Sequence, residues 1–119
     1  MPQYLNFFAG RNALAIIRER GLNPADITVM AGAAGGPKWL ILGHLDRVIF
    51  TSWLKDGTKP LFLVGASSGA WRFCAAAQAD PGAAIGRLEE AYIHQQYKHK
   101  PTPEEVTAEA EKILDHALG

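Results

Sequence analysis

The sequence feature that most restricts the fold is a short apolar run that ends in a loop of small residues. Leu61–Val64 is unbroken in hydrophobicity and leads into Gly65–Gly69, and the alanine-rich residues 70–79 follow. Runs of this kind are typical of strands that are buried on both faces of a parallel sheet. The pattern therefore predicts a buried strand, a tight turn and a helix, in that order.

A similar unit precedes this one. Ile27–Ala31 has the composition of a strand, and a glycine-rich loop, residues 32–37, follows it. Pro37 suits the first turn of a helix, and the spacing of the apolar side chains predicts that this helix covers residues 38–55. Two parallel strands that a helix connects belong to one sheet with a right-handed crossover. The expected fold class is thus α/β, built on a βαβ parallel unit.

Helices are expected on both sides of this unit. Gly10–Arg20 precedes it with apolar residues on one face, and residues 83–98 follow it as a further helix. A last helix is expected to begin at Pro103, because Thr102 and Glu105 have the spacing of a capping box.

Length and charge exclude several classes of protein. The chain has 119 residues, with 12 basic and 12 acidic side chains, so one domain is expected and nucleic acid is not expected as a partner. The single cysteine, Cys74, excludes a disulfide within the chain and indicates a reducing compartment, and we expect it to be a small buried residue. No secretory signal and no apolar stretch of about 20 residues is recognisable, so a cytoplasmic protein is expected.

The loop Gly65–Gly69 has the pattern Gly-x-Ser-x-Gly between a strand and a helix. In a nucleophile elbow this spacing places a serine, here Ser67, on a strained turn, and Gly65 and Gly69 avoid clashes with the neighbouring strand and helix. The amide of Ser68 is then a natural donor to an oxyanion. A tight strand-to-helix turn with no catalytic role needs small residues as well, so the motif alone leaves both interpretations open.

The glycine-rich loop is expected at the same edge of the sheet, where open α/β sheets place their sites. The amides of Gly35 and Gly36 are candidate donors to an oxyanion. Neither the P-loop pattern nor the dinucleotide-binding pattern fits the loop, which disfavours a small anion binder. Lys38 is a candidate contact for an anionic group, although a solvated side chain is the simpler interpretation. No metal site is expected, because His94 and His99 do not share a helix face.

Together the two loops resemble those of the patatin-like phospholipases, a family of serine lipid acyl hydrolases. Gly35–Lys38 matches the start of the family's oxyanion loop, Gly65–Gly69 matches its nucleophile motif, and the resemblance covers about residues 27–80. Residues 89–92 resemble those of bacterial members more weakly. The resemblance implies a larger three-layer domain and a Ser–Asp dyad without a cofactor. It also implies that the substrate is a lipid or another ester. Contact with a membrane surface is compatible with such a substrate.

In that chemistry Ser67 attacks the ester carbonyl, and the amides of Gly35, Gly36 and Ser68 hold the oxyanion. The sequence departs from the family pattern at three places in the first loop. Trp39 stands where the family has a glycine, and Ala33 and Ala34 replace two others.

The dyad aspartate is the larger departure. The family places it in an Asp-Gly motif after the serine, whereas Asp56 precedes Ser67, and Asp80 and Asp115 are not in that motif. We therefore expect residues 1–119 to be the N-terminal part of a patatin-like domain, inactive alone. The alternative is a catalytically inactive module for lipid or protein interaction that retains the elbow as a tight turn.

Overall fold

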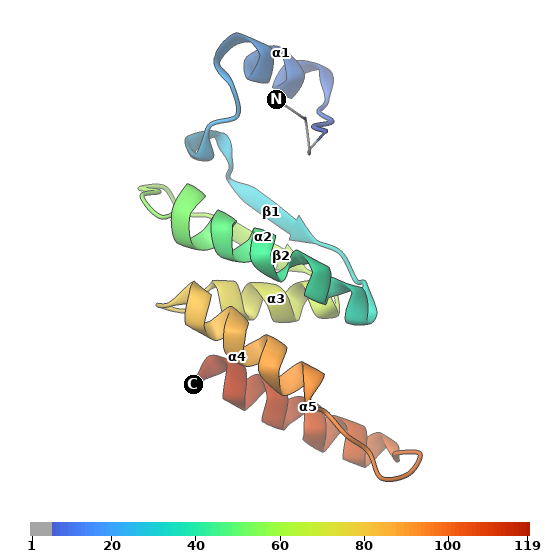
Figure 1. Ribbon diagram of the computed structural model, residues 1–119. Coiled ribbons are helices and arrows are strands. Elements are labelled where there is room, and N and C mark those ends of the chain that lie inside the picture. Colours follow the sequence, from blue (N-terminus) through green and yellow to red (C-terminus); the bar gives the residue numbers. More distant parts are fainter. Residues whose placement is uncertain (1–5) are drawn as a thin grey trace.

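The computed structural model describes residues 6–119, so the start of the chain, where a secretory signal was sought, lies partly outside the described residues. The protein is a mixed helix and strand structure with a two-stranded parallel sheet. Figure 1 shows the order of its elements, which are α1 (Arg11–Arg20), η1 (Pro24–Asp26), β1 (Val29–Gly32), η2 (Gly36–Leu42), α2 (Gly43–Val48), η3 (Ile49–Trp53), β2 (Phe62–Gly65), α3 (Ser68–Ala76), α4 (Pro81–Ile93) and α5 (Pro103–Leu118).

The predicted βαβ unit is confirmed. Strands β1 and β2 pair in parallel with Val29 beside Phe62 and Gly32 beside Gly65, and the helical residues 36–53 connect them. Because parallel strands end at the same edge, the loop after β1 and the loop after β2 begin next to each other. This register brings the glycine-rich loop to the serine loop.

The crossover is not the single α-helix that the sequence predicts for residues 38–55. It is a 3₁₀ segment, η2, then the short helix α2, and then a π-helical turn, η3. The wide turn is visible in the bond from the amide of Leu54 to the carbonyl of Ile49, 2.8 Å long and five residues back. Nearby, the hydroxyl of Thr51 donates to the carbonyl of Arg47, and this local bond competes with the regular helix ladder.

One face of the sheet is exposed, so the prediction that Leu61–Val64 is buried on both faces is wrong. Helix α3 packs on the face that carries Gly32 and Gly65. On the other face the side chains of Val29, Phe62 and Val64 are 56%, 64% and 60% exposed. An apolar run reports the hydrophobicity of a strand, and it carries no information on how many faces another element covers.

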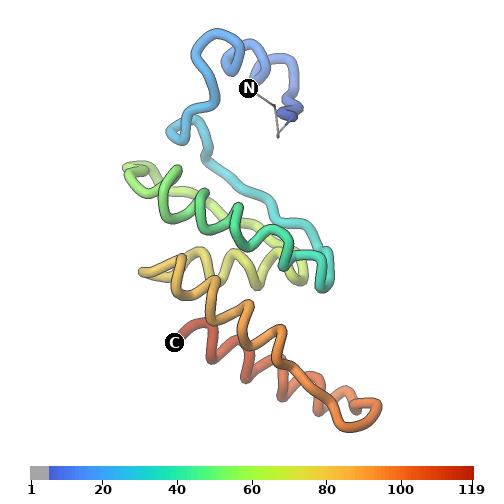
Figure 2. The backbone as a smooth tube through the Cα atoms, in the orientation of Figure 1, coloured from blue at the N-terminus to red at the C-terminus, as the bar shows by residue number. Residues whose placement is uncertain are grey.

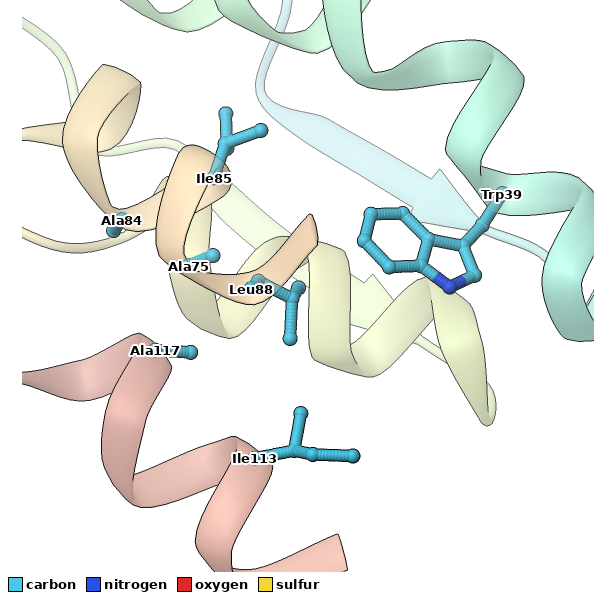
Figure 3. Packing of buried hydrophobic residues seen from close by; sticks show 7 residues of the cluster. All are labelled: Trp39, Ala75, Ala84, Ile85, Leu88, Ile113 and Ala117. Atoms are coloured by element: carbon cyan, nitrogen blue, oxygen red, sulfur yellow. The ribbon is translucent and has the colours of Figure 1, made fainter. Parts of the chain in front are cut away.

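The hydrophobic core lies among the helices rather than on the sheet. Small side chains allow α3, α4 and α5 to approach closely, and Figure 3 shows Trp39 reaching toward them from η2. The buried cluster consists of Trp39, Ala75, Ala84, Ile85, Leu88, Ile113 and Ala117. Cys74 lies outside this buried arc of α3 and is exposed, which corrects its prediction as a buried residue.

The capping box at the start of α5 is confirmed. The hydroxyl of Thr102 accepts from the amide of Glu105 at 3.3 Å, and the Glu105 carboxylate accepts from the amide of Thr102 at 2.8 Å. Figure 2 shows that α1 and the pair of helices α4 and α5 lie at opposite ends of the molecule. The radius of gyration is 16.8 Å, whereas a compact domain of this length has about 13–14 Å. The molecule is therefore elongated, with the sheet near its middle.

Candidate functional site

Ser67 occupies the turn between β2 and α3 in an unusual backbone conformation. Its φ is 51° and its ψ is −124°, and it is the one non-glycine residue with positive φ in the described part of the chain. Side chains disfavour this region by about 1–3 kcal/mol, and such residues cluster at functional sites. The side chain of Ser67 is exposed at the start of α3. The backbone thus holds the hydroxyl outward, at the positive end of the helix dipole.

Three glycines bring the two strand ends and α3 into backbone contact. A Cβ atom on Gly65 would overlap the backbone of Ala70, and one on Gly69 would overlap the carbonyl of Gly32. A Cβ atom on Gly32 would lie 2.8 Å from the ring of Phe73. Real Cβ atoms do not come so near to other heavy atoms, so the turn at Ser67 requires these positions to lack side chains.

Two hydrogen bonds fasten the glycine-rich loop to the serine loop. The amide of Ala66 donates to the carbonyl of Gly32 at 3.0 Å. The amide of Gly35 donates to the hydroxyl of Ser68, also at 3.0 Å. The two loops named by the sequence analysis are therefore neighbours in space, although 33 residues separate Gly35 from Ser68.

The residues proposed to hold an oxyanion differ in the hydrogen bonds and the position of their backbone amides. The amide of Gly35 is already bonded to the Ser68 hydroxyl. Ser68 is the first residue of α3, so its own amide has no carbonyl partner within the helix. Gly36 has a φ of 52° and lies beside Ser67 at the wall of a cavity. Lys38 is exposed and does not line that cavity, which leaves it as a solvated side chain in this structure.

The cavity beside Ser67 has a volume of about 170 Å³. Its walls come from the glycine-rich loop, the serine loop, α3 and α4, and they consist of Gly36, Trp39, Ser67, Ser68, Trp71 and Tyr92. At the level of the sequence, Trp39 is only a departure from a family pattern, and Trp71 is not placed at the site. Trp39 comes directly after the glycine-rich loop, and Trp71 lies one helical turn after Ser67. These positions were the signal in the sequence that could have placed both residues at the site. Tyr92 comes from a helix far along the chain and gave no such signal.

No side chain among residues 6–119 is hydrogen-bonded to the hydroxyl of Ser67, and three aspartates in this part of the chain have other partners or positions. Asp46 is paired with Arg72. Asp80 caps α4 by accepting from the amide of Ala83 at 3.0 Å. Asp56 lies in the turn before β2, at the other edge of the sheet. The described residues therefore contain no base in contact with the serine.

The carboxylate of Asp26, whose pKa is lowered, is also remote from Ser67. A hydrogen bond from the Arg20 guanidinium holds the pKa of Asp26 below its usual range. Asp26 precedes β1, whereas Ser67 follows β2. In a parallel sheet these are opposite edges, so this pair has no part in the chemistry of the serine.

Two kinds of feature are absent from the described residues. Across residues 6–119 no group of three or more histidine, cysteine, aspartate or glutamate side chains is arranged to hold a metal ion. No helix in that same part combines the length and the apolar character needed to cross a membrane.

Comparison with known proteins gave no match: no family model, no curated protein and no solved structure matches this chain. The features of this chain that bear on its function are therefore the two loop motifs and the geometry around Ser67. That geometry consists of a strained serine at a helix N-terminus, an adjoining glycine-rich loop and an aromatic cavity.

Proposed function

We propose that the protein is a serine acyl hydrolase of the patatin-like type, with Ser67 as its nucleophile and a lipid or other ester as its substrate. The observation that carries this proposal is the backbone of Ser67. A non-glycine residue with a φ of 51° stands between a parallel strand and a helix, with glycines at both flanking positions of the motif. This arrangement exposes the hydroxyl at the end of α3, where negative charge is stabilised.

The chemistry follows from these positions. The Ser67 oxygen attacks the ester carbonyl carbon while its proton passes to a base, and the carbonyl oxygen becomes an oxyanion. The amides of Ser68 and Gly36 donate to that oxyanion, and the amide of Gly35 joins them by exchanging its bond to the Ser68 hydroxyl. The intermediate then expels the protonated alcohol and leaves an acyl group on Ser67. Water attacks this acyl-enzyme in the same way and releases the carboxylic acid.

The base of the proposed dyad is a carboxylate from outside the described residues. No carboxylate among residues 6–119 is hydrogen-bonded to Ser67, and Asp46 and Asp80 have structural partners. A serine without a base remains a weak nucleophile. We accordingly expect the 119-residue chain alone to show no esterase turnover, and the three-layer domain of the family to be needed around it.

The test uses the natural full-length protein and hydrolysis of p-nitrophenyl esters. Ser67→Ala is expected to lower kcat by about 1000-fold or more, because it removes the attacking atom. Ser68→Ala is the matched control. It removes a neighbouring hydroxyl that orders the Gly35 amide, so a loss of only about tenfold is expected.

Hydrolysis that survives Ser67→Ala would contradict the proposal. Absence of hydrolysis in the unsubstituted protein would favour the alternative, in which the elbow is a tight turn in a catalytically inactive module for lipid or protein interaction. The bond between Gly35 and the Ser68 hydroxyl would be the feature that favours this reading, because it occupies one of the amides that the reaction needs.

A further inference from the structure

Two consecutive residues of α2 form ion pairs in different directions, and neither pair lines the cavity beside the serine. The Asp46 carboxylate accepts from the Arg72 guanidinium of α3 at 2.7 and 2.6 Å. The Arg47 guanidinium donates to both carboxylate oxygens of Glu89 on α4. The crossover between the strands is thus tied, by two separate pairs, to each of the two helices that follow β2.

The pair of Asp46 and Arg72 is the more buried of the two. Its side chains are 5% and 12% exposed, whereas those of Glu89 and Arg47 are 20% and 30% exposed. Two N–H···O bonds side by side fix the guanidinium in one orientation relative to the carboxylate. The Arg72 group also lies over the ring of Phe73, 5.8 Å from its centre. Movement of α2 against α3 would leave a buried charge without its partner, so this pair holds the two helices in one relative position.

Each partner of this pair belongs to a helical segment that begins at one half of the candidate site. Asp46 follows the glycine-rich loop through η2, which starts after Gly35 and continues into α2 without a break. Arg72 lies on α3, which starts directly after Ser67. The ion pair therefore joins the segment that carries the proposed oxyanion donors to the segment that carries the proposed nucleophile.

At the glycine-rich loop itself the fastening is weaker. Gly35 is exposed, and the bond from its amide to the Ser68 hydroxyl is the contact that the proposed reaction exchanges. When that amide turns to an oxyanion, the loop is held by the residues that follow it in η2 and α2. These are the buried side chain of Trp39 and the ion pair of Asp46 with Arg72. The position of the donors relative to the nucleophile thus depends on this pair when negative charge develops.

We infer that Asp46 and Arg72 are positioning residues for the reaction of Ser67, and that their pair keeps the amides of the glycine-rich loop at bonding distance from the oxyanion. The inference rests on the proposed function, because it names residues that serve the same serine. A displacement of about 1 Å in such a group lowers a rate by up to about 100-fold. The pair of Arg47 and Glu89 has no such part, since α4 provides neither the nucleophile nor an oxyanion donor.

The first experiment measures kcat and KM of the natural full-length protein for p-nitrophenyl butyrate. Asp46→Asn keeps the size of the side chain but replaces one acceptor oxygen by a donor, so it breaks the double bond pattern to Arg72. We expect kcat to fall by about 10–100-fold with little change in KM, because the oxyanion exists only after the serine has attacked. Glu89→Gln is the matched control. It makes the same change in the other ion pair of α2, and kcat should stay close to that of the unsubstituted protein.

A second measurement separates positioning from a loss of folded protein, which would also lower kcat. A trifluoromethyl ketone takes the serine oxygen onto its carbonyl carbon, the serine proton passes to the base, and the ketone oxygen becomes an oxyanion. Its Ki therefore reports the oxyanion donors and does not depend on the folded fraction. We expect Ki to rise about tenfold in Asp46→Asn and to stay unchanged in Glu89→Gln. Combining Asp46→Asn with Arg72→Lys should lower kcat no further than the more affected single variant, because both changes break one pair.

Hydrogen exchange, followed by mass spectrometry of peptides from the full-length protein, tests the position of the loop without turnover. The peptide that contains Gly35 should exchange about tenfold faster in Asp46→Asn than in Glu89→Gln, because the bond from its amide to the Ser68 hydroxyl opens more often. Peptides of α5 should exchange alike in the two variants. If Asp46→Asn fails to fold, Arg72→Lys, which keeps the positive charge, takes its place.

Unchanged kcat and Ki in Asp46→Asn, in a protein that hydrolyses esters through Ser67, would overturn the inference and leave the proposed function standing. Absence of hydrolysis in the unsubstituted protein would contradict the proposed function. Equal exchange of the Gly35 peptide in Asp46→Asn and Glu89→Gln would show, with or without hydrolysis, that the pair of Asp46 and Arg72 does not position the loop.

Discussion

At the scale of single residues, the site depends on positions that have no side chain. Gly32, Gly65 and Gly69 stand where a Cβ atom would overlap a neighbouring group, and Ser67 accepts a strained backbone between them. The motif spacing predicts the need for small residues around Ser67. It does not reveal that Gly32, far earlier in the chain, meets Gly69 directly.

Gly69→Ala tests this packing. Within a helix the change ordinarily stabilises by about 1 kcal/mol, but here the new methyl overlaps the Gly32 carbonyl. We expect the opposite sign, a loss of about 1–3 kcal/mol in the free energy of unfolding. Urea unfolding of the 119-residue chain measures it.

Gly86→Ala is the control for this prediction. Gly86 lies inside α4, and a Cβ built there meets only the Arg47 guanidinium at 3.6 Å, so this variant should show the ordinary stabilisation of about 1 kcal/mol. Equal stability of the two variants would show that Gly69 does not need to be glycine.

At the scale of elements, an ion pair fixes the helix that carries Ser67. The Arg72 guanidinium on α3 donates twice to the Asp46 carboxylate on α2, at 2.7 and 2.6 Å. The two side chains are 12% and 5% exposed. Because 26 residues separate the partners, no local pattern predicts the pair. The capping box at Thr102 was predictable for the contrary reason, since Thr102 and Glu105 are three positions apart at the start of one helix.

Asp46→Ala is expected to destabilise the protein by about 3–5 kcal/mol, because it leaves the Arg72 guanidinium buried without a partner. Glu109→Ala is the comparison, since its bond to Lys112 joins exposed side chains on α5 and should be worth less than about 1 kcal/mol. Denaturant unfolding compares the two variants. A loss below about 1 kcal/mol for Asp46→Ala would mean that the pair does not anchor α3 to the crossover.

At the scale of the whole molecule, the helical core and the sheet have different surroundings. Helices α3, α4 and α5 bury a common cluster, whereas one face of the sheet exposes Val29, Phe62 and Val64. The sequence correctly predicts the parallel pairing of the strands and the presence of the helices that follow, although α4 ends at Ile93, five residues before its predicted end. Burial of the second sheet face was predicted from hydrophobicity alone, and hydrophobicity does not say which element covers a strand. The aromatic cavity escaped prediction for a similar reason, because Tyr92 reaches it only through the packing of α4.

The exposed sheet face should bind a hydrophobic dye. Phe62 and Val64 form with Val29 a contiguous apolar surface, and such surfaces bind anilinonaphthalene sulfonate. Phe62→Ser in the 119-residue chain is expected to lower the dye fluorescence by about half. Val106→Ser, at a 43% exposed position on α5, should change it little. If the two substitutions lowered the dye fluorescence equally, the exposed face of the sheet would not be the preferred binding surface of the dye.

The most direct test of the central claim is covalent labelling of the natural full-length protein with a fluorophosphonate. Peptide mapping by mass spectrometry then locates the adduct. We predict a single adduct on Ser67, which is absent in Ser67→Ala and retained in Ser68→Ala. An adduct on Ser68, or no adduct on Ser67 under conditions that label a known serine hydrolase, would contradict the assignment of Ser67 as the nucleophile.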